Sequence, residues 1–409
     1  MTGPRVSVVV PHYDDPQRLR WVLQALEQQR GAPPIDVVVA DDGSPEPPAL
    51  PDVRLPVRLV RQDRQGFRAA AARNLGAANA CGDPLIFLDG DTLPAPGFVR
   101  AMVEAIARHE RGHGVLAVGR RRHVRLEGLG DAQILHHLVR EQVPADRDLG
   151  SPAWLTGGYA RTRNLTAAGP EDFRLVISAV LATTRGLFER IGGFDASMVG
   201  YGGEDWDLAF RAWVAGADLV HAPDAVAWHD GPDLAGRGFD IRDRKNLESL
   251  ALADRIPLRS ARPPGVHHPV PRVLVTLRLG RSGAAAALTC VGELLRGDDV
   301  GVWLLDRDEV PGPLRHDPRV HAGSPPPAAL ARSPRRVDLR QPLLLGRTVD
   351  QLTDLEVPNL LSARDARDLA RGVTLPPTPL PDGMSVLHDE PFLERRWAVA
   401  EAERGAVPC

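Results

Sequence analysis

The stretch Pro84-Leu85-Ile86-Phe87-Leu88-Asp89-Gly90-Asp91 decides the fold class that we predict for this chain. Its apolar part predicts a buried strand, and such strands in α/β sheets open onto ligands at their carboxyl ends. Two carboxylates across one glycine form a short oxygen clamp, which suits Mg²⁺ or Mn²⁺ shared with substrate phosphates. Alone, an Asp-Gly-Asp string is more often a turn, because Asp and Gly tolerate unusual backbone angles. The rest of the chain must therefore decide between these interpretations.

Strand and helix patterns alternate on both sides of this stretch. Before and after it we predict strands at 6–10, 36–40 and 57–60 and helices at 18–29, 68–80 and 96–108. An irregular region follows at 110–175, with a possible substrate-facing loop at 154–159. Beyond it we predict strands at 176–182 and 225–228 and helices at 187–191 and 205–215. This alternation predicts a mostly parallel sheet with helices on both faces.

The C-terminal part is predicted to be a separate, smaller α/β domain. Prolines cluster at 263–271, so we predict a catalytic domain over 1–262, a linker, and a second domain over 272–409. The two parts have a possible internal repeat, because Pro271-Arg272-Val273 matches Pro4-Arg5-Val6 and 342–348 echoes 84–92 without its acids. The alternative is that any two βαβ units look alike.

The composition is that of a soluble globular protein. The chain has 409 residues, 43% of them apolar and 25% charged, and a net charge of -3, which favours neither nucleic acid nor an acidic membrane. The 3 cysteines are far apart and lack metal-ligand spacing, which indicates a reducing cytoplasm. No apolar window approaches the roughly 18 residues of a transmembrane helix, so we expect no membrane-spanning segment.

A second acidic site follows the predicted strand at 36–40. Asp41 and Asp42 stand at its carboxyl end, where a carboxylate can accept hydrogen bonds from a ribose or a base. Tyr13, which follows the first strand, could stack on that base. Arg68, at the start of an alanine-rich helix that also carries Arg73, could bind a diphosphate. The alternatives are turns for the acids and a solvated helix face for the arginines.

The string Gly202-Gly203-Glu204-Asp205-Trp206-Asp207 is the most unusual in the chain. Acids in the first turn of a helix can simply complement its dipole. Three acids with two glycines and a tryptophan exceed that need, however, and a carboxylate beside a substrate hydroxyl can act as a general base. His229, after another predicted strand, could be a further metal ligand.

Taken in order, these motifs resemble those of the family 2 glycosyltransferases, whose fold is the α/β fold called GT-A. The chain is similar to the N-acetylgalactosaminyltransferase domain of bacterial chondroitin polymerase and to the Gly-Gly-Glu-Asp region of galactosyltransferases. The motifs that carry the resemblance, which covers roughly residues 4–260, are 8–13, 41–44, 72–74, 89–91, 192–195, 202–205, 227–232 and 245–247.

The resemblance implies roles for individual residues. Asp205 would be the catalytic base, and Glu204 would hold the donor sugar or the acceptor. Asp91 and His229, with Asp89 nearby, would bind Mn²⁺ or Mg²⁺. Arg244 and Lys245 would lie on a mobile segment that closes over the diphosphate. The residues expected to bind the nucleotide-sugar are Pro11, Tyr13, Asp41, Asp42, Arg68, Asp89, Gly203 and Lys245.

The implied reaction is an inverting transfer from a nucleoside diphosphate sugar, a UDP-sugar above all, because one base and one metal suffice for a single displacement. The acceptor, on a glycan, peptide or small molecule, stays unknown. Polymerases of this family carry a second complete catalytic domain, whereas 272–409 lacks the acidic motifs. We therefore expect a degenerate repeat there, which could also support a homodimer.

Three alternatives compete with this interpretation. A phosphatase of the haloacid dehalogenase type would need Thr or Val where Leu93 stands. A sugar-1-phosphate nucleotidyltransferase would need a glycine-rich loop with an arginine after the first strand. A glycan-binding or scaffolding protein that has lost turnover is the remaining alternative, against which Asp91, Asp205 and His229 argue.

Overall fold

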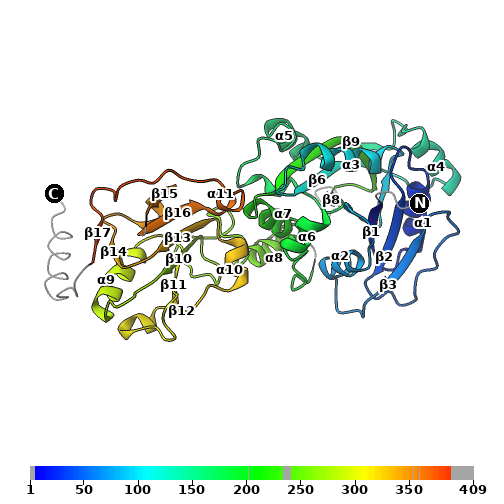
Figure 1. Ribbon diagram of the computed structural model, residues 1–409. Coiled ribbons are helices and arrows are strands. Elements are labelled where there is room, and N and C mark those ends of the chain that lie inside the picture. Colours follow the sequence, from blue (N-terminus) through cyan, green and yellow to red (C-terminus); the bar gives the residue numbers. More distant parts are fainter. Residues whose placement is uncertain (1–4, 201, 234–240, 353, 359, 388–409) are drawn as a thin grey trace. The chain divides into compact units, whose positions relative to one another are not determined.

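The computed structural model describes residues 5–200, 202–233, 241–352, 354–358 and 360–387 (Figure 1). The chain forms two compact units, Met1–Leu252 and Ala253–Cys409. Each unit contains a sheet covered by helices, so the predicted fold class, a mixed α/β sheet with a smaller α/β unit after it, is confirmed.

The first unit is built on a 9-stranded sheet of order β3-β2-β1-β4-β8-β6-β9-β5, with β7 paired to β6. Its strands are β1 Val6–His12, β2 Ile35–Asp41, β3 Val57–Arg61, β4 Leu85–Leu88, β5 Thr92–Pro94, β6 Val115–Val124, β7 Asp148–Gly150, β8 Val180–Thr183 and β9 Asp218–Asp230. Its helices are α1 Pro16–Glu27, α2 Ala69–Ala78, α3 Phe98–His109, α4 Asp131–Val139, α5 Ala153–Arg161, α6 Arg185–Arg190, α7 Glu204–Val214 and α8 Ile241–Ala253, with a 3-10 turn at Asp172–Leu175.

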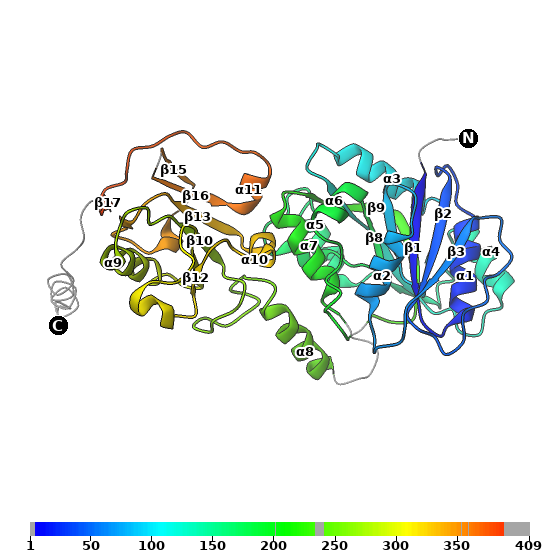
Figure 2. The same ribbon diagram turned by 60° about the horizontal axis from the view of Figure 1, so that its bottom comes forward.

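The parallel half of this sheet forms as the sequence predicts. Strand β1 pairs in parallel with β2 and β4, and its valines are fully buried. Helix α1 begins at Pro16, and the carboxylate of Asp15, the residue before it, caps the helix by accepting the Arg18 N–H. Helices α1 and α2 cover opposite faces of the sheet (Figure 2), as right-handed crossovers in opposite directions require. The carboxyl ends of β1, β2 and β4 therefore open at one edge.

The region predicted to be irregular, 110–175, contains regular structure, so that prediction is wrong. Strand β6 crosses it between β8 and β9, and α5 replaces the loop predicted at 154–159. The second half of β6 is the run Arg120-Arg121-Arg122-His123, whose charge hides the strand pattern in the sequence. These side chains have partners in the fold, such as Asp148 for Arg122, so the strand can carry them.

Strands β6 and β9 run in parallel with one irregularity that shapes the site. The register shifts between Gly119, paired with Ala222, and Arg120, paired with Val226, so β9 has extra residues there. A Cβ on Gly119 would lie 2.7 Å from the Ala225 carbonyl oxygen, so the glycine allows this close approach. The shift brings His123 opposite His229.

The second unit has a 6-stranded sheet of order β12-β11-β10-β13-β16-β15 and a separate pair, β14 with β17. Its strands are β10 Val273–Leu277, β11 Val300–Leu304, β12 Val320–Ala322, β13 Arg335–Leu339, β14 Leu343–Leu344, β15 Leu355–Val357, β16 Leu361–Asp365 and β17 Ser385–Val386. Its helices are α9 Ala284–Leu294, α10 Pro327–Arg332 and α11 Ala366–Ala370, with 3-10 turns at Gly312–His316 and Val349–Gln351.

The chain divides before the predicted linker. The boundary between the units falls after Leu252, whereas the linker was predicted at 263–271. The Arg262 side chain is 2% exposed, pairs with Asp299 and donates to the Val270 carbonyl oxygen at 2.8 Å. These contacts attach the proline-rich segment to the second unit.

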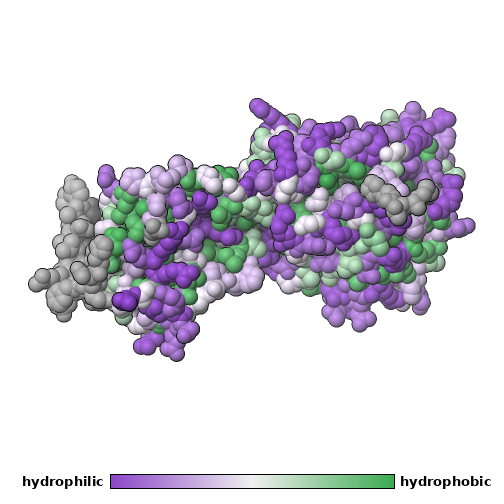
Figure 3. All heavy atoms as spheres, viewed as in Figure 1, coloured by the Kyte–Doolittle hydropathy of each residue, from purple (hydrophilic) through white to green (hydrophobic). Residues whose placement is uncertain are grey.

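No helix among the described residues is long and apolar enough to cross a membrane. Figure 3 shows hydrophilic and apolar residues mixed over the visible face of each unit.

Candidate active site

A cavity of about 430 Å³ opens at the strand-end edge of the first unit. Its walls come from the end of β4, from β6, from the first turn of α7, and from Lys245 and Glu248 of α8. Predicted and unpredicted residues meet there, among them Arg73, Asp89, Arg121, His123, Gly203, Glu204, Asp205, Trp206, Lys245 and Glu248. Asp89, Gly203 and Lys245, three of the predicted nucleotide-sugar residues, therefore share one cavity with the predicted base.

Arg73 connects the two acidic motifs. Its guanidinium donates to Asp89 Oδ1 at 2.6 Å and to Glu204 Oε1 at 3.0 Å, and its side chain is 4% exposed. Burial opposes the charge on Arg73, but the carboxylates of Asp89 and Glu204 outweigh it and raise the Arg73 pKa. Arg73 therefore stays charged and fixes two acids that are far apart in sequence. From the sequence, Arg73 was considered only with Arg68, as a possible diphosphate ligand or part of a solvated helix face, and its contacts with Asp89 and Glu204 were not predicted.

Asp91 and His229 face each other across the β5–β9 pair. Asp91 Oδ2 lies 3.3 Å from His229 Nε2, and the strand register places Thr92 opposite His229. Burial opposes ionisation of Asp91, but the hydrogen bond and the electrostatic attraction to His229 outweigh it and lower the Asp91 pKa to about 2. The Gly231 carbonyl oxygen lies 3.4 Å from His229 Nδ1. This contact orients the ring with Nε2 toward Asp91.

This pair fits a divalent cation that is also bound by a substrate. Neighbouring ligands of an octahedral ion with bonds of about 2.1 Å lie roughly 3 Å apart, close to the Asp91–His229 separation. No group of three or more His, Cys, Asp or Glu side chains placed to hold a metal occurs within the described part of the chain. Asp89, the third predicted ligand, is paired with Arg73 instead. A cation here would depend on substrate oxygens for most of its ligands.

His123 adjoins this pair, and sequence reasoning missed it. Its ring centroid lies 4.6 Å from that of His229, and its Nδ1 lies 2.8 Å from the Gly231 carbonyl oxygen. Burial lowers the His123 pKa to about 4, so the ring is neutral at pH 7. A signal existed in the sequence: the apolar run 115–118 continues directly into the basic run 120–123, as a strand entering a polar site does.

Asp205 lies in the first turn of α7 and has a strongly shifted pKa. Its Oδ1 accepts the Trp206 N–H at 2.8 Å and its Oδ2 accepts the Ser178 N–H at 3.3 Å. Burial, together with the charge of neighbouring Glu204, raises the Asp205 pKa to about 7. A carboxylate with such a pKa can take up a proton from a substrate near neutral pH.

The two glycines before α7 are required by packing against α8. Gly202 and Gly203 have φ of 93° and 91°, a region that other residues rarely adopt. A Cβ on Gly202 would lie 2.8 Å from Glu248 Oε2. Lys245, on the same face of α8, donates to Glu248 at 2.8 Å and lies 5.0 Å from the Trp206 ring centre. The predicted binding residues Gly203 and Lys245 are thus held against each other by Glu248.

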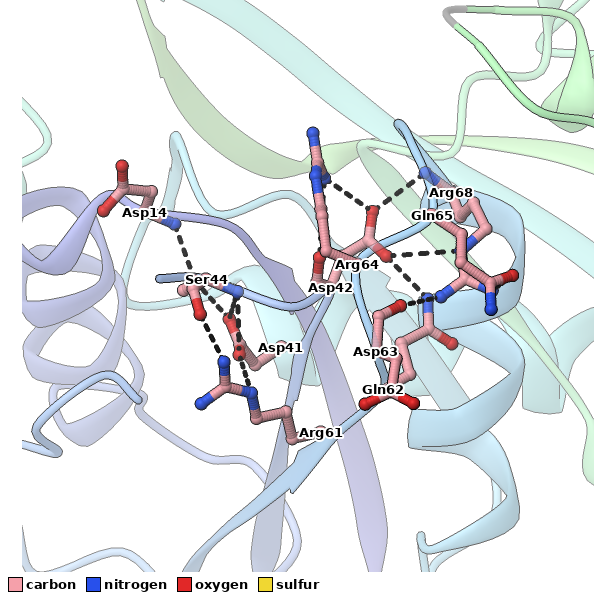
Figure 4. Close-up of polar contacts among 10 residues, drawn as sticks. All are labelled: Asp14, Asp41, Asp42, Ser44, Arg61, Gln62, Asp63, Arg64, Gln65 and Arg68. Atoms are coloured by element: carbon pink, nitrogen blue, oxygen red, sulfur yellow. Dashed lines mark hydrogen bonds and ion pairs between the residues drawn. The ribbon is translucent and has the colours of Figure 1, made fainter. Parts of the chain in front are cut away.

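Tyr13 and Asp42, the residues predicted to bind the nucleobase, contact other groups of the protein. Figure 4 shows the contacts of Asp42. The Asp42 carboxylate accepts the Gln62 side-chain amide at 2.7 Å and the Arg68 N–H at 2.8 Å, and it lies 3.3 Å from Arg64 Nη1. The Arg64 guanidinium also covers the Tyr13 ring at 3.7 Å from its centre. Arg64 therefore stacks on Tyr13 and bonds to Asp42, the two contacts predicted for a nucleobase.

Asp41 does not face the cavity, which differs from its predicted contact with the nucleotide. Consecutive residues of a strand point to opposite faces, so Asp41 and Asp42 diverge. The Asp41 side chain is 0% exposed; it accepts the Ser44 hydroxyl and pairs with Arg61 Nε at 3.3 Å. Pro11 lies beside the acidic clamp, because a Cβ on Gly90 would be 3.1 Å from the Pro11 carbonyl oxygen. Asp41 therefore shapes the loop, and Pro11 supports the clamp.

The sheet order and the acidic strand ends define the first unit as a GT-A domain. Two family models match it: "Glycosyl transferase family 2" over residues 7–155 and "N-terminal domain of galactosyltransferase" over residues 169–227. The resemblance to family 2 glycosyltransferases is therefore confirmed over residues 7–155, and the resemblance to the galactosyltransferases over residues 169–227.

Curated relatives match the same part of the chain. Hyaluronan synthase of Pasteurella multocida is 26% identical over 62% of this chain and 27% of its own length. Validoxylamine A glucosyltransferase of Streptomyces hygroscopicus subsp. limoneus is 32% identical over 53% of this chain and 49% of its own. Chondroitin synthase of Escherichia coli is 26% identical over 62% and 38%. The aligned part of this chain thus spans about a quarter to a half of these relatives.

Solved structures of low identity also align. Mannosyltransferase PcManGT from Pyrobaculum calidifontis, in complex with GDP-Man and Mn²⁺, aligns with 20% identity and a TM-score of 0.41 over 61% of this chain and 64% of its own. S. aureus TarS aligns with 14% identity and a TM-score of 0.39 over 61% and 39%.

Proposed function

We propose that this chain is an inverting, metal-dependent glycosyltransferase that moves a sugar from a nucleoside diphosphate sugar, a UDP-sugar in the first instance, to an acceptor hydroxyl. The family match supports sugar transfer, and relatives are named as glucosyltransferase and as polysaccharide synthases. The observation that carries the proposal is the single cavity that holds both Asp89, at the end of β4, and Asp205, with its pKa of about 7.

The groups in the cavity, and the Asp91–His229 pair outside its lining, each have a chemical task under this proposal. Asp205 accepts the proton of the acceptor hydroxyl, and the neutral form that results suits its buried place. Arg73 holds Asp89 toward the donor and Glu204 toward the reacting sugar. A divalent cation on Asp91 and His229 would supply neutralisation of the leaving diphosphate. One base and one displacement imply inversion at the anomeric carbon.

The nucleotide would bind at the Tyr13 and Asp42 end of the site. Arg64 must leave the Tyr13 ring before a base can stack there, because both would occupy the same face at 3.7 Å. Lys245, which lines the cavity and donates to Glu248 on α8, would contact the diphosphate.

A thermal-shift panel tests the donor and the metal without knowledge of the acceptor. UDP, GDP, ADP and TDP would each be added with Mn²⁺, with Mg²⁺ and with EDTA. We expect one nucleotide, UDP, to raise the melting temperature, and the shift to require the cation. Donor turnover that persists in excess chelator would contradict metal dependence. Binding without any turnover of UDP-sugars would favour the alternative, a glycan-binding protein that has lost catalysis.

We further propose that residues 272–409 carry no metal or nucleotide site and serve acceptor placement or self-association. Asp306, at the end of β11, accepts the Leu279 N–H at 3.0 Å and the Gly280 N–H at 2.7 Å, so its carboxylate is taken up by the neighbouring loop. A fragment of residues 253–409, the whole second unit, tests this. It should show no thermal shift with nucleotides and Mn²⁺, and light scattering would report whether it dimerises.

A further inference from the structure

A second cavity, of about 310 Å³, lies in the first unit beside the candidate active site. Its walls come from the middle of β6, from α5 and from the β9 irregularity at Pro223. Arg121 lines both cavities, so they are neighbours across one side chain. The stretch 154–159, predicted from the sequence to be a substrate-facing loop, contributes Leu155, Thr156 and Tyr159 to its wall. None of the roles proposed above uses this cavity.

The charge of the second cavity differs from that of the first. Arg120 and Arg121 line it, and no acidic residue does. The first cavity is lined by acids that outnumber its cations, namely Asp89, Glu204, Asp205, Asp233 and Glu248 against Arg73, Arg121 and Lys245. A ligand that extended from the first cavity into the second would therefore meet a positive electrostatic field only at the end that lies in the second cavity.

His221 gives the second cavity a buried hydrogen-bond acceptor. Its side chain belongs to a residue that is 7% exposed, and its ring stacks on Tyr159 with the centres 3.7 Å apart. Nδ1 lies 2.9 Å from Asn164 Oδ1, so Nδ1 carries the proton and Nε2 accepts. Burial, with a smaller effect of the Arg120 charge, lowers the His221 pKa to about 4, so the ring is neutral. Nε2 is buried and has no partner among the described residues.

The backbone that holds Asn164 is strained. Arg163, Asn164 and Leu165 have φ of 52°, 56° and 67°, which makes three consecutive non-glycine residues left-handed. Such residues normally occur singly, and strain of this kind persists where the surrounding structure enforces it. Here the Asn164 carbonyl oxygen accepts the His221 N–H at 2.9 Å, and Thr162 Oγ1 accepts the Leu165 N–H at 3.1 Å. The turn fixes Asn164, which in turn fixes the His221 ring.

These observations describe a built polar site with two arginines, of which Arg121 also pairs with Asp233 at 3.4 Å, and a buried acceptor without a partner among the described residues. Ser151 Oγ, also on its wall, is buried without a partner in the described chain. Arginines bind carboxylates and phosphates, and a neutral imidazole nitrogen binds a hydroxyl. An anionic sugar offers both groups.

We propose that the second cavity is an acceptor subsite for a hydroxylated compound that bears an anionic group, either a carboxylate or a phosphate. The anionic group binds Arg120 and Arg121, an adjacent hydroxyl donates to His221 Nε2, and the nucleophilic hydroxyl extends past Arg121 toward Asp205. This inference rests on the proposed glycosyltransferase function, for which it specifies the class of acceptor.

The test measures binding of small probes to the full chain by saturation-transfer NMR and calorimetry. The probes are methyl β-glucuronide, methyl β-glucoside 6-phosphate and neutral methyl β-glucoside. We expect at least one anionic probe to bind about tenfold or more tightly than the neutral one, as a charge-assisted hydrogen bond allows. The anionic probe with the higher affinity shows whether the site prefers a carboxylate or a phosphate.

Variants connect this preference to the cavity. Arg120→Gln should remove the preference, Arg120→Lys should keep most of it, and His221→Gln should weaken both anionic probes. Arg140→Gln, at an exposed arginine outside the cavity lining, is the matched control. Equal binding of all three probes, or a preference that survives Arg120→Gln, would overturn the inference. The thermal shift with UDP and Mn²⁺ should be the same in Arg120→Gln, so failure of the subsite is distinguishable from failure of the proposed function.

Discussion

Strands β3-β2-β1-β4-β8-β6 of the first unit and β12-β11-β10-β13-β16-β15 of the second follow the same order. Pairings also agree in direction: β1 is parallel to β2 and β4, as β10 is to β11 and β13, while β8 and β16 run antiparallel to their neighbours. In chain order, β6 precedes β8 as β15 precedes β16. We infer that the second unit is a copy of the first in which the sheet has been kept.

The chemistry at the strand ends has not been kept. Val9 pairs with Phe87, and Thr276, at the matching place of β10, pairs with Asp338. Asp89 and Asp91 then correspond to Arg340 and Pro342. The echo predicted at 342–348 is wrong, because β14 lies in a separate pair outside the main sheet. The comparison shows that a buried parallel sheet does not depend on acidic residues at its strand ends. Burial of apolar residues such as valine specifies the sheet, whereas the acidic strand end serves function.

The difference between the strand ends of the two units can be tested by substitutions at corresponding positions. We expect Asp91→Ala to reduce UDP-sugar turnover by about 10⁴-fold or more, because the variant loses a metal ligand and with it several kcal/mol of transition-state stabilisation. Pro342→Ala, at the position that corresponds to Asp91, should leave turnover unchanged. Steady-state release of UDP measures both. Equal losses in the two variants would show that both units contribute to one site.

A second test removes the base. Asp205→Asn should lower the transfer rate by about 10²–10⁴-fold and leave donor affinity unchanged, as expected for loss of a general base. In the wild type the rate should rise with pH through about 7, because burial and Glu204 raise the Asp205 pKa to about 7 and only the ionised form accepts a proton. A parallel loss of donor binding would make Asp205 a structural residue of α7 instead.

The same variant should be more stable than the wild type at high pH. The Asp205 pKa is about 7 in the fold against a usual 3.8, so the fold favours the protonated form. Stability from this group is present below about 3.8 and is lost as the pH rises through 7. Asp205→Asn, which stays neutral, should therefore gain about 2–4 kcal/mol at pH 8, and the gain should vanish near pH 4. Urea unfolding at the two pH values measures the difference. A gain that is independent of pH would assign it to another cause.

The smallest expected effect is a change in UDP affinity on substitution of Arg64. Arg64→Ala should tighten UDP binding by roughly three- to tenfold, because the Tyr13 ring and the Asp42 carboxylate no longer have to be vacated. Arg307→Ala, in the loop of the second unit after β11, is the control and should not alter the affinity. Calorimetric titration with UDP and Mn²⁺ decides. Weaker binding in Arg64→Ala would mean that Arg64 itself contacts the nucleotide.

The parts of the fold that follow from the sequence are those where burial dictates residue type. Strands β1, β2 and β4 and helices α1, α2 and α3 appear within a few residues of their predicted bounds, because their apolar spacing is uninterrupted. Strand β6 was missed because half of it faces a polar site with Arg121 and His123. Helix α5 was missed because its Gly157 and Gly158 are typical of loops.

The site divides in the same way. From the motifs, Asp89, Glu204 and Asp205 could be predicted to lie close together, because strand ends and helix starts meet at one edge of such a sheet. The three residues line one cavity. Arg73, His123 and Arg64 could not be assigned, because their importance lies in contacts across long sequence separations: Arg73 with Glu204, His123 with His229, and Arg64 with Tyr13.

Under the proposed function, the position of Arg64 over Tyr13 would make nucleotide binding an exchange reaction with an unusual dependence on salt. The Arg64–Asp42 pair lies 3.3 Å apart with the arginine side chain 37% exposed, so dissolved ions screen it. Added salt therefore loosens the group that competes with the base, while it weakens the attraction of the diphosphate for its cation. The two effects have opposite signs. UDP affinity should consequently fall less steeply with ionic strength in the wild type than in Arg64→Ala, where only the second effect remains.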